Sequence, residues 1–443
     1  MNTQDEKIRF DAIVVGAGLA GSAAAMMMAR EGLNVALIER GQKAGGKNYF
    51  GGAIYTHAIG EVLPDFMDRK PPFERPVTEA GFWMLSKDGG LTKMTVQGGK
   101  LGAEPADAYM ASRAVFDVWW ADQAQREGAL LIPKTSVVDF IRDGAGQVIG
   151  VKTDRAQGDV YAPVVIICEG VNNILSQKLG LIDHDLEPAH MALAFKQVIA
   201  LPMDTINARF GLPDEKHGLA ASVLGDVSLG LPGMGFVYTN NTSVSVGLGM
   251  MLDAVVEYRL KPYEVLQRYL RHPAIAPLIA GGQLMEYGAH LIPEGGYRDM
   301  PKLYTGGAMV AGDAASMVNA LHWEGTNMAI VAGKLAAETA IEAHKRGDFS
   351  AQVLSQYEAR LKDRFILKDM KQYRNFARFL ETHPEFMDAY PSFINDALGQ
   401  FFSAYGMPKK KLFKNMLGSL TSRRQLFKAV GDMLSMGRAV MGW

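Results

Sequence analysis

Residues 10–40, FDAIVVGAGLAGSAAAMMMAREGLNVALIER, carry the pattern that decides the fold of this chain. A β-branched run leads into Gly16, Gly18 and Gly21, which have the spacing G-x-G-x-x-G. The small-residue stretch 22–30 follows and predicts a helix, and the short apolar run after it predicts another strand. The order strand, glycine turn, helix, strand is typical of a dinucleotide-binding βαβ unit.

Each glycine in this unit has a physical role. Gly16 permits the tight turn, Gly18 lets the backbone approach a pyrophosphate, and Gly21 lets the helix pack closely on the strand. The helix N-terminus offers unpaired N–H donors to phosphate oxygens. Glu39 closes the second strand and can accept hydrogen bonds from a ribose diol. The pattern predicts a bound dinucleotide without deciding between NAD and FAD, and a coincidental glycine-rich turn is the alternative.

Two later segments also read as strands that end in small or acidic residues. Residues 160–170, VYAPVVIICEG, end in Glu169-Gly170, and residues 303–316, LYTGGAMVAGDAAS, contain Gly312-Asp313. Ligands of open α/β sheets collect at the carboxyl ends of the strands. The three strand ends are too far apart in sequence for one small unit, so they predict a discontinuous domain with a second domain inserted between its pieces.

This arrangement resembles the FAD-dependent, glutathione-reductase-type fold of the hydroxylase and geranylgeranyl-reductase superfamily. The resemblance implies that Asp313 binds the flavin ribitol. It also implies that the helix following Gly325 points its N-terminus at the pyrimidine edge of the ring, with backbone N–H groups of Thr326 and Asn327 facing the flavin. A helix N-terminus carries about half a positive charge, which favours an anionic reduced flavin. An ordinary strand-end turn is the alternative reading of Asp313.

Residues 112–120, SRAVFDVWW, resemble the R-x-x-F-D segment of that superfamily, whose arginine lies near the FAD pyrophosphate. The fork-shaped guanidinium of Arg113 suits phosphate oxygens. A solvated helix that happens to carry one arginine is the alternative.

Five separated blocks are similar to a narrower group, the electron-transfer flavoprotein:quinone oxidoreductase family, and most of all to its short FixC-type branch. The match runs in order over roughly residues 8–400, and the blocks are 44–52 (AGGKNYFGG), 195–202 (FKQVIALP), 232–249 (PGMGFVYTNNTSVSVGLG), 290–301 (HLIPEGGYRDMP) and 322–336 (HWEGTNMAIVAGKLAA). Two departures stand out. Glu169 replaces the usual aspartate, and residues 322–324 are bulkier and more acidic than expected before a flavin-facing helix.

The motifs and the resemblance together indicate two sets of site residues. The cofactor-binding set is Gly16, Gly18, Ala20, Gly21, Glu39, Arg40, Lys47, Arg113, Val137, Glu169, Gly170, Gly312, Asp313, Gly325, Thr326 and Asn327. The candidates for a quinone or acceptor pocket are Asn48, Tyr55, His57, Tyr238, His322 and Trp323, each of which taken singly is more typical of a structural role. No nucleophile, general base or metal ligand is assigned, because the flavin performs the redox step.

The expected fold class is α/β, with a discontinuous Rossmann-type FAD domain, an inserted and mainly antiparallel β-sheet domain, and a C-terminal helical region. Alternation of apolar and small residues over 242–248 suits such a sheet. The predicted boundaries are 1–80, 108–185 and 300–345 for the FAD domain, 81–107 and 186–299 for the quinone-side sheet domain, and 346–443 for the helical region.

Cysteine content constrains the partners. The 443 residues include a single cysteine, Cys168, whereas an iron-sulfur cluster usually needs four thiolates. Single-chain members of the resembled family carry their own [4Fe-4S] cluster, and in the FixC-type branch a small ferredoxin-like subunit supplies it. The resemblance therefore implies that subunit as a partner, a two-subunit electron-transfer flavoprotein as the electron source, and a membrane quinone as the acceptor. A net charge of -1 gives no reason to expect nucleic acid.

The C-terminal segment is the most basic part of the chain. Residues 405–443 hold eight lysines and arginines against one acid, Asp432, and from Phe413 onward the apolar residues follow a helical stripe. Such a helix can lie in a membrane interface, or it can pack on a protein surface. The start of the chain shows no secretory signal and no run reaches the roughly 18 apolar residues of a span, so we expect a cytoplasmic protein with peripheral membrane contact.

Two other functions share the same fold. A prenyl-lipid (geranylgeranyl) reductase is the first alternative, although its motif Y-x-W-x-F-P is absent and 235–238 reads GFVY. The second is an FAD relay or scaffold subunit with no substrate site of its own.

Overall fold

The computed structural model describes residues 8–46, 51–183, 186–319, 321–322, 324–403, 406, 408–411, 414 and 423–441. Its chain divides into two compact units, and each unit is assembled from three separate stretches. The first unit comprises Met1–Phe73, Ala111–Glu187 and Ile292–Lys371, and the second comprises Glu74–Met110, Pro188–Leu291 and Gln372–Trp443.

A six-stranded sheet with the order β18-β19-β12-β2-β3-β8 forms the centre of the first unit. Five of its strands run parallel, and β18 pairs with β19 in the antiparallel sense. A four-stranded sheet of order β1-β11-β10-β9 lies in the same unit. The strands are β1 (Ile8–Arg9), β2 (Ala12–Val15), β3 (Val35–Ile38), β4 (Gly51–Tyr55), β8 (Leu130–Ile132), β9 (Val137–Arg142), β10 (Val148–Thr153), β11 (Val160–Tyr161), β12 (Val165–Ile167), β18 (Tyr304–Thr305) and β19 (Ala308–Val310).

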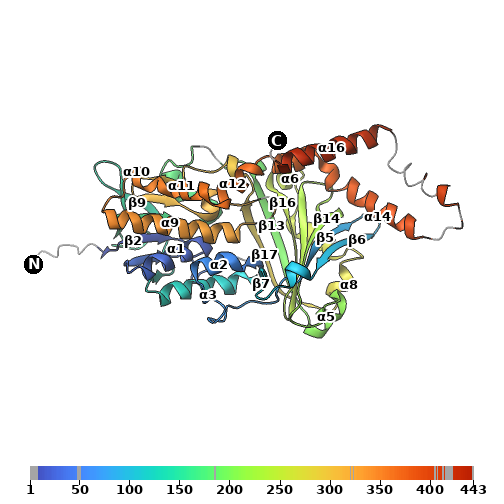
Figure 1. Cartoon of the computed structure of the whole chain (residues 1–443), viewed down its shortest axis with the longest axis horizontal. Helices are drawn as coiled ribbons and strands as arrows, with labels where there is room; N and C mark the ends of the chain where they lie inside the picture. Colours follow the sequence, from blue (N-terminus) through green and yellow to red (C-terminus); the bar gives the residue numbers. More distant parts are fainter. Residues whose placement is uncertain are drawn as a thin grey trace, which may run out of the picture. The chain divides into compact units, whose positions relative to one another are not determined.

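Helices α1 and α9 lie side by side against this parallel sheet (Figure 1). The first helix begins at Leu19, three residues before the predicted start, because Gly18 serves as its N-cap. Its alanines are buried, so the small-residue run packs between the sheet and neighbouring helices. The helices of this unit are α1 (Leu19–Arg30), α2 (Thr56–Val62), α3 (Arg113–Arg126), α4 (Ile174–Lys178), α9 (Thr326–Arg346), α10 (Ala351–Leu354), α11 (Gln356–Asp363) and α12 (Phe365–Gln372).

The second unit is built on a seven-stranded sheet of order β17-β13-β16-β15-β14-β5-β6. Among the described pairings only β14 with β5 is parallel, which confirms the predicted mainly antiparallel sheet. Val244, Val246 and Leu248 alternate along one strand and are buried in the core of this unit. The strands of this sheet are β5 (Glu79–Leu85), β6 (Leu91–Gln97), β13 (Met191–Ala200), β14 (Leu219–Gly225), β15 (Gly233–Thr239), β16 (Ser243–Met251) and β17 (Gln283–Pro293). Strand β7 (Ala108–Ser112) lies outside this sheet, and the boundary between the units falls within it, after Met110.

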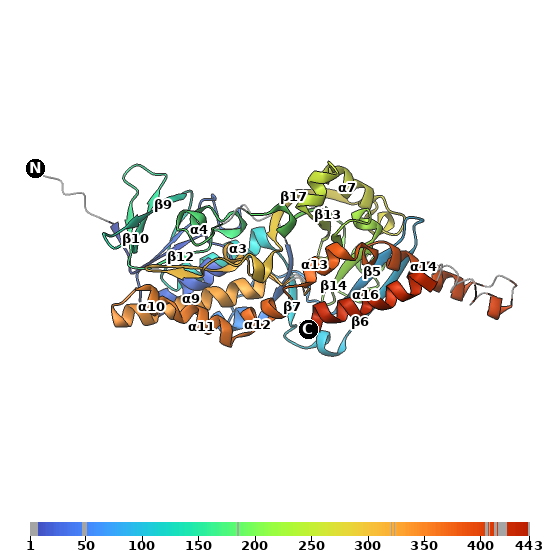
Figure 2. The same cartoon turned by 90° about the horizontal axis from the view of Figure 1, so that it is seen from above.

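Helices flank the sheet of the second unit. Four of them come from its middle stretch, and they are α5 (Met203–Phe210), α6 (Leu252–Glu257), α7 (Pro262–Leu270) and α8 (Ala276–Ile279). Three come from its last stretch, and they are α13 (Phe376–Thr382), α14 (Ala389–Phe402) and α16 (Arg423–Met441). Helix α14 packs on β5 and β14, and α16 lies along α13 (Figure 2). The predicted tail helix is therefore present from Arg423, while the earlier part of its stripe, Met416 and Leu420, lies outside the described residues.

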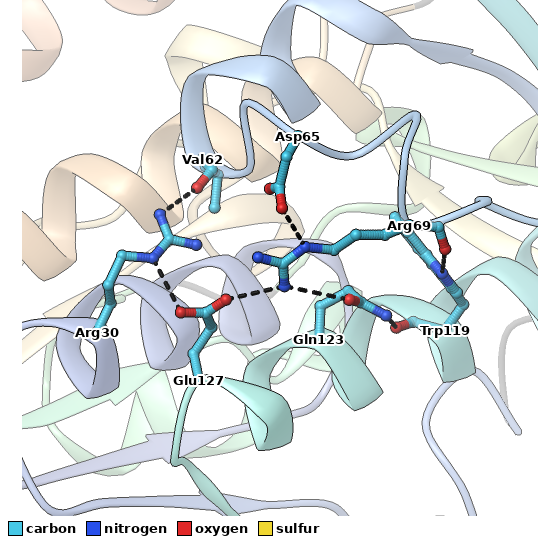
Figure 3. Close-up of polar contacts among 7 residues, drawn as sticks. All are labelled: Arg30, Val62, Asp65, Arg69, Trp119, Gln123 and Glu127. Carbon is cyan, nitrogen blue, oxygen red and sulfur yellow. Dashed lines mark hydrogen bonds and ion pairs between the residues drawn. The ribbon is translucent and has the colours of Figure 1, made fainter.

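A polar network ties the ends of α1 and α3 to the loop after α2 (Figure 3). The Glu127 carboxylate accepts hydrogen bonds from Arg30 Nε at 3.2 Å and from Arg69 Nη1 at 2.8 Å, so it forms ion pairs with both arginines. Arg30 also donates to Val62 O at 2.8 Å. Burial raises the pKa of Glu127, but the two guanidinium groups outweigh it and hold that pKa below its ordinary value.

Replacing Glu127 with glutamine tests this network. Because the folded-state pKa of Glu127 is lowered, its stabilisation is fully present above the unfolded pKa and is lost as the pH falls through the folded pKa. We expect Glu127→Gln to reduce the free energy of unfolding by about 1–2 kcal/mol at pH 7, with the difference from wild type shrinking below about pH 4. Urea unfolding at several pH values measures this.

The matched control is Glu257→Gln, at an exposed glutamate that ends α6 and has no ion pair within the described ranges. It should leave stability unchanged across the same pH range. An equal loss at pH 3 and pH 7 in Glu127→Gln would contradict the ionic role.

Candidate functional site

The carboxyl ends of four parallel strands meet at one edge of the six-stranded sheet. Val15 ends β2, and it is in register with Ile167 of β12 and Ile38 of β3. Ile167 is in turn in register with Val310 of β19. The three motifs separated in sequence, at Gly16, Glu169 and Gly312, are therefore brought together at this edge, as predicted.

Backbone contacts at the β2–α1 turn leave no room for a side chain. Gly16 has φ +100°, and a Cβ there would stand 2.2 Å from Cys168 O. A Cβ on Gly21 would stand 1.8 Å from Gly16 O. Gly18 differs, because nothing lies within 4 Å of its Cβ position, and it caps the N-terminus of α1. The turn thus offers an open backbone surface beside unpaired helix N–H groups, which is the environment a pyrophosphate requires.

Glu39 lies directly beside this turn. Its Oε2 accepts from Ala17 N at 3.0 Å and its Oε1 accepts from Gly41 N at 2.6 Å, so the carboxylate is fixed at the end of β3. Thr135 N donates to Glu39 O, which brings the predicted Val137 into the same neighbourhood two residues further on. Arg40 is exposed. This is the position at which a carboxylate reads a ribose in dinucleotide-binding folds.

Helix α9 approaches α1 as closely as two backbones allow. A Cβ on Gly333 of α9 would stand 2.1 Å from Ala20 O of α1. Gly312, with φ +72°, faces the same alanine, its Cβ position lying 3.2 Å from Ala20 Cβ. Ala20 is therefore the contact point of both helices and the β19 turn. Gly333 was not singled out from the sequence, although a glycine within a strong helical pattern is a usable signal for such contact.

Asp313, at the turn after β19, influences the pKa values of two buried charged groups, Arg113 and Glu294. Arg113 Nε and Nη2 bind Asp117 Oδ1 and Oδ2 at 2.6 and 2.9 Å, a bidentate pair. Burial lowers the pKa of Arg113, but the charges of Asp117 and Asp313 raise it above its ordinary value. Burial, and then the charge of Asp313, raise the pKa of Glu294 to about 7. Asp117 and Glu294 were not predicted, although Asp117 stands four residues after Arg113, the spacing of a helical ion pair.

The Glu169 side chain is engaged elsewhere. Its carboxylate accepts from Leu175 N and Ser176 N, each at 2.8 Å, and from Ser176 Oγ at 3.0 Å. It thereby caps the start of α4, and Gly170 with φ +74° makes the turn between them. Glu169 can meet a cofactor through its backbone, while its side chain positions α4.

Hydrogen bonds of Asn319 and Asn327 hold the turn that precedes α9. Gly325 is its N-cap and Thr326 Oγ1 lies 3.5 Å from Ala53 O. Asn327 Nδ2 donates to Glu324 Oε2 at 3.1 Å. Asn319 exchanges backbone hydrogen bonds with Glu324, at 2.8 and 3.3 Å, and closes the turn that contains the predicted His322.

The acceptor-pocket candidates separate into groups. Tyr55 and His57 lie in the first unit with ring centroids 6.5 Å apart, and burial and then the charge of Glu324 raise the pKa of Tyr55 to about 12. Tyr238 belongs to the second unit, stacked on Phe236 at 4.8 Å. The pocket candidates Asn48 and Trp323 lie outside the described residues, as does Lys47 of the predicted cofactor-binding set.

The first unit therefore presents a glycine turn open to phosphate, a fixed carboxylate for a ribose, an aspartate at the end of β19, and a second helix N-terminus. These features fit an elongated dinucleotide. Within the described part of the chain, no three His, Cys, Asp or Glu side chains gather in a way that could hold a metal ion. The fold and site define an FAD-dependent oxidoreductase.

Family comparisons narrow this class. Residues 11–171 match the model for FAD dependent oxidoreductases, 224–292 match "ETF-QO, ubiquinone-binding", and 376–441 match "ETF-QO/FixC family C-terminal domain". The chain belongs to the ETF-QO/FixC family, that of electron-transfer flavoprotein:quinone oxidoreductases, because similarity to curated members extends over nearly its whole length.

Three relatives illustrate the similarity. Protein FixC of Azorhizobium caulinodans is 39% identical over 98% of this chain and 99% of its own length. Protein FixC of Azotobacter vinelandii is 40% identical over 98% and 99%. The probable electron transfer flavoprotein-quinone oxidoreductase YdiS of Escherichia coli is 38% identical over 93% and 94%.

Solved structures confirm the fold. A geranylgeranyl bacteriochlorophyll reductase-like protein of Thermoplasma acidophilum superposes with a TM-score of 0.72 at 22% identity, covering 96% of this chain and 99% of that one. The myxobacterial chondrochloren halogenase, an FAD-dependent enzyme, gives 0.64 at 20% identity, covering 84% and 82%.

Two alanine substitutions separate the two roles of the glycine turn. Gly18→Ala meets no atom within 4 Å, so we expect the apoprotein to keep its melting temperature to within a degree or two while FAD binds about tenfold or more weakly. Gly16→Ala collides with Cys168 O and is expected to destabilise the fold itself. Calorimetric titration of apoprotein with FAD, and thermal unfolding without it, measure the two effects. Unchanged FAD affinity in Gly18→Ala would contradict a pyrophosphate at this turn.

Proposed function

We propose that this protein accepts electrons from a two-subunit electron-transfer flavoprotein and passes them through its FAD to a membrane quinone. The observation that carries the proposal is the match of 224–292 to a ubiquinone-binding model within a chain related to FixC over almost its full length. The site residues named above are proposed to hold the FAD.

The protein's own contribution to this chemistry is positioning and electrostatics. FAD supplies the redox step once bound. The α9 N-terminus, with Thr326 and Asn327 as its first residues, is proposed to place partial positive charge beside the flavin ring, which favours the reduced, anionic state. Asp313 is proposed to hold the ribitol, and Glu39 the adenosine ribose.

An iron-sulfur partner is part of the proposal. The chain contains one cysteine, Cys168, which is partly buried at the end of β12. Burial, and then the neighbouring Glu169 charge, raise the pKa of its thiol, so the thiolate that binds iron is disfavoured. A [4Fe-4S] cluster on the electron path would therefore be held by a separate, ferredoxin-like subunit.

The outer face of α16 supports contact with a membrane surface. Val430, Met433 and Leu434 are 51%, 66% and 65% exposed, and Met441 continues their stripe. The opposite face is anchored, because Asp432 is buried and accepts a hydrogen bond from Tyr390. No helix in the described ranges is long and apolar enough to cross a bilayer. We propose that α16 lies in the interface on the cytoplasmic side, where a quinone is reached.

The proposed function is tested by the acceptor that reoxidises the flavin. The protein, loaded with FAD and photoreduced without oxygen, is mixed with a short-chain ubiquinone or with a geranylgeranyl lipid, and flavin absorbance is followed. We expect rapid reoxidation by the quinone alone. Reoxidation by the lipid alone would replace the proposal with a prenyl reductase, and no reoxidation by either would favour a relay subunit.

Vesicle binding tests the role of α16. We expect the double substitution Met433→Glu with Leu434→Glu to reduce partitioning onto vesicles of zwitterionic and anionic phospholipid by about tenfold or more, because apolar contact is lost and anionic charge repels the surface. Gln352→Glu, at an exposed position of α10 in the other unit, adds negative charge outside α16 and should bind like wild type. Equal binding of all three proteins would contradict the proposed interface helix.

A further inference from the structure

A buried lysine lies within the seven-stranded sheet of the second unit. Lys196 belongs to β13, and its side chain is only 2% exposed. Lysines are seldom buried to this degree, because taking the ammonium group out of water is costly unless close partners compensate for it. A charged partner is Glu286 of the neighbouring strand β17, in the same unit.

The contact between these two groups is long for a buried ion pair. Lys196 Nζ is 3.8 Å from Glu286 Oε1, which is beyond hydrogen-bond length. The same Oε1 is buried and has no hydrogen-bond partner among the described residues. Burial lowers the pKa of Lys196, and the charge of Glu286 opposes that shift. A buried polar atom without a hydrogen bond is uncommon, and a bound water or ligand is one usual explanation.

Strand register places Lys196 on the face of the sheet that points away from the hydrophobic core. Gly247 of β16 is the register partner of Lys196, and Phe236 of β15 is the register partner of Gly247. The core of this unit takes the alternate residues of the same strands, such as Phe195 and Val237. Because successive side chains of a strand point to opposite faces, Lys196 and Phe236 share the other face.

Two aromatic rings adjoin the lysine on this face. A Cβ on Gly247 would stand 2.6 Å from Lys196 Cβ and 2.5 Å from Phe236 Cζ, so the lysine side chain and the ring are neighbours above the glycine. Phe236 stacks on Tyr238 with ring centroids 4.8 Å apart and an angle of 18° between the planes. Tyr238 and Ser222, which is in register with Phe236, are only partly buried, so this face is not closed.

These side chains match the chemistry of a quinone head group. A quinone is a flat ring that carries two carbonyl groups. Aromatic side chains pack on such a ring, and an ammonium group can donate to a carbonyl oxygen. Phe236 and Tyr238 lie within 224–292, the range that matches the ubiquinone-binding model. Lys196 lies outside that range, so the match assigns it no role.

We propose that Lys196 donates a hydrogen bond to a carbonyl oxygen of the quinone, whose ring packs on Phe236 and Tyr238. Glu286 is then a positioning residue that holds the ammonium group in place. The inference rests on the proposed quinone reduction and adds to it the residue that selects for a carbonyl. A ring of similar size without that carbonyl binds more weakly, because the buried ammonium group loses an acceptor.

Replacing Lys196 with methionine tests this contact. Methionine is also long and unbranched but cannot donate a hydrogen bond from its end. In the FAD-loaded, photoreduced protein, we expect Lys196→Met to raise the concentration of short-chain ubiquinone that gives half-maximal flavin reoxidation about tenfold or more. Reoxidation by ferricyanide, which has no carbonyl, should change by no more than about twofold. The control is Lys100→Met, the same substitution at an exposed position of the same unit, which should behave like wild type.

Infrared difference spectroscopy gives a readout that does not depend on turnover. A hydrogen bond to a carbonyl oxygen lowers the C=O stretching frequency. Short-chain ubiquinone with carbon-13 in its carbonyl groups is bound at saturating concentration to the oxidised holoenzyme. We expect a lowered carbonyl band in wild type and in Lys100→Met, and the frequency of unbound quinone in Lys196→Met. The same band in all three proteins would overturn the proposed hydrogen bond.

A double variant separates recognition of the quinone from stability of the fold. Lys196→Met leaves the Glu286 carboxylate without its cation, which is expected to lower stability. Lys196→Met combined with Glu286→Gln removes both charges. We expect the double variant to unfold at a temperature close to that of wild type and to show the same loss of quinone affinity as Lys196→Met. Wild-type quinone affinity in the double variant would mean that Lys196 only neutralises Glu286, and would overturn the contact.

The outcomes separate the two proposals. Wild-type protein whose flavin is reoxidised by ferricyanide but by no quinone would remove the proposed function and the contact with it. If wild type reduces quinone, the role of Lys196 alone is removed by either of two results. One is a Lys196→Met protein with unchanged quinone affinity, and the other is a Lys196→Met protein impaired equally toward quinone and ferricyanide.

Discussion

The structure depends on a close approach of backbone to backbone at the β2–α1 turn. Gly16 faces Cys168 O and Gly21 faces Gly16 O, at distances that no Cβ could occupy. These contacts fix where β12 lies relative to β2 and how α1 leaves the sheet. As a result, the unpaired N–H groups of α1 point over the strand ends, and Ala17 N can hold the Glu39 carboxylate. The open turn at Gly18 and the fixed Glu39 carboxylate, which we propose bind phosphate and ribose, are consequences of this packing.

The same kind of contact places the second helix. Gly333 lets α9 approach Ala20 of α1, and Gly312 lets the β19 turn approach the same residue. The small side chain of Ala20 therefore allows close packing of α1, α9 and the turn after β19, which come from opposite ends of the sequence. Since a flavin enzyme needs orientation and charge more than a reactive side chain, the precise placement of two helix N-termini is the principal chemical property of the first unit.

Local patterns predicted this part of the structure well. The turn at Gly16, the strand ending before Gly312 and the mainly antiparallel sheet each have a signal in glycine spacing or apolar period, because the chain must satisfy them locally. The failures concern side-chain partners. Neither the capping of α4 by Glu169 nor the pairing of Arg113 with Asp117 was predicted, although both contacts are local in sequence. The i,i+4 spacing could have indicated the Arg113 pair, whereas the Glu169 cap depends on the turn that the chain makes at Gly170.

The discontinuity of the first unit has a consequence for biosynthesis. Its parallel sheet takes β2 from the first stretch of the chain, β12 from the second and β19 from the third, with α9 following. A nascent chain leaves the ribosome from its N-terminus, so β12 is exposed as an unpaired edge until the 140 residues that separate it from β19, residues 168–307, have been synthesised. Contacts of such sequence separation fold slowly. The strand order therefore determines how long the incomplete sheet remains able to form incorrect strand pairings during synthesis.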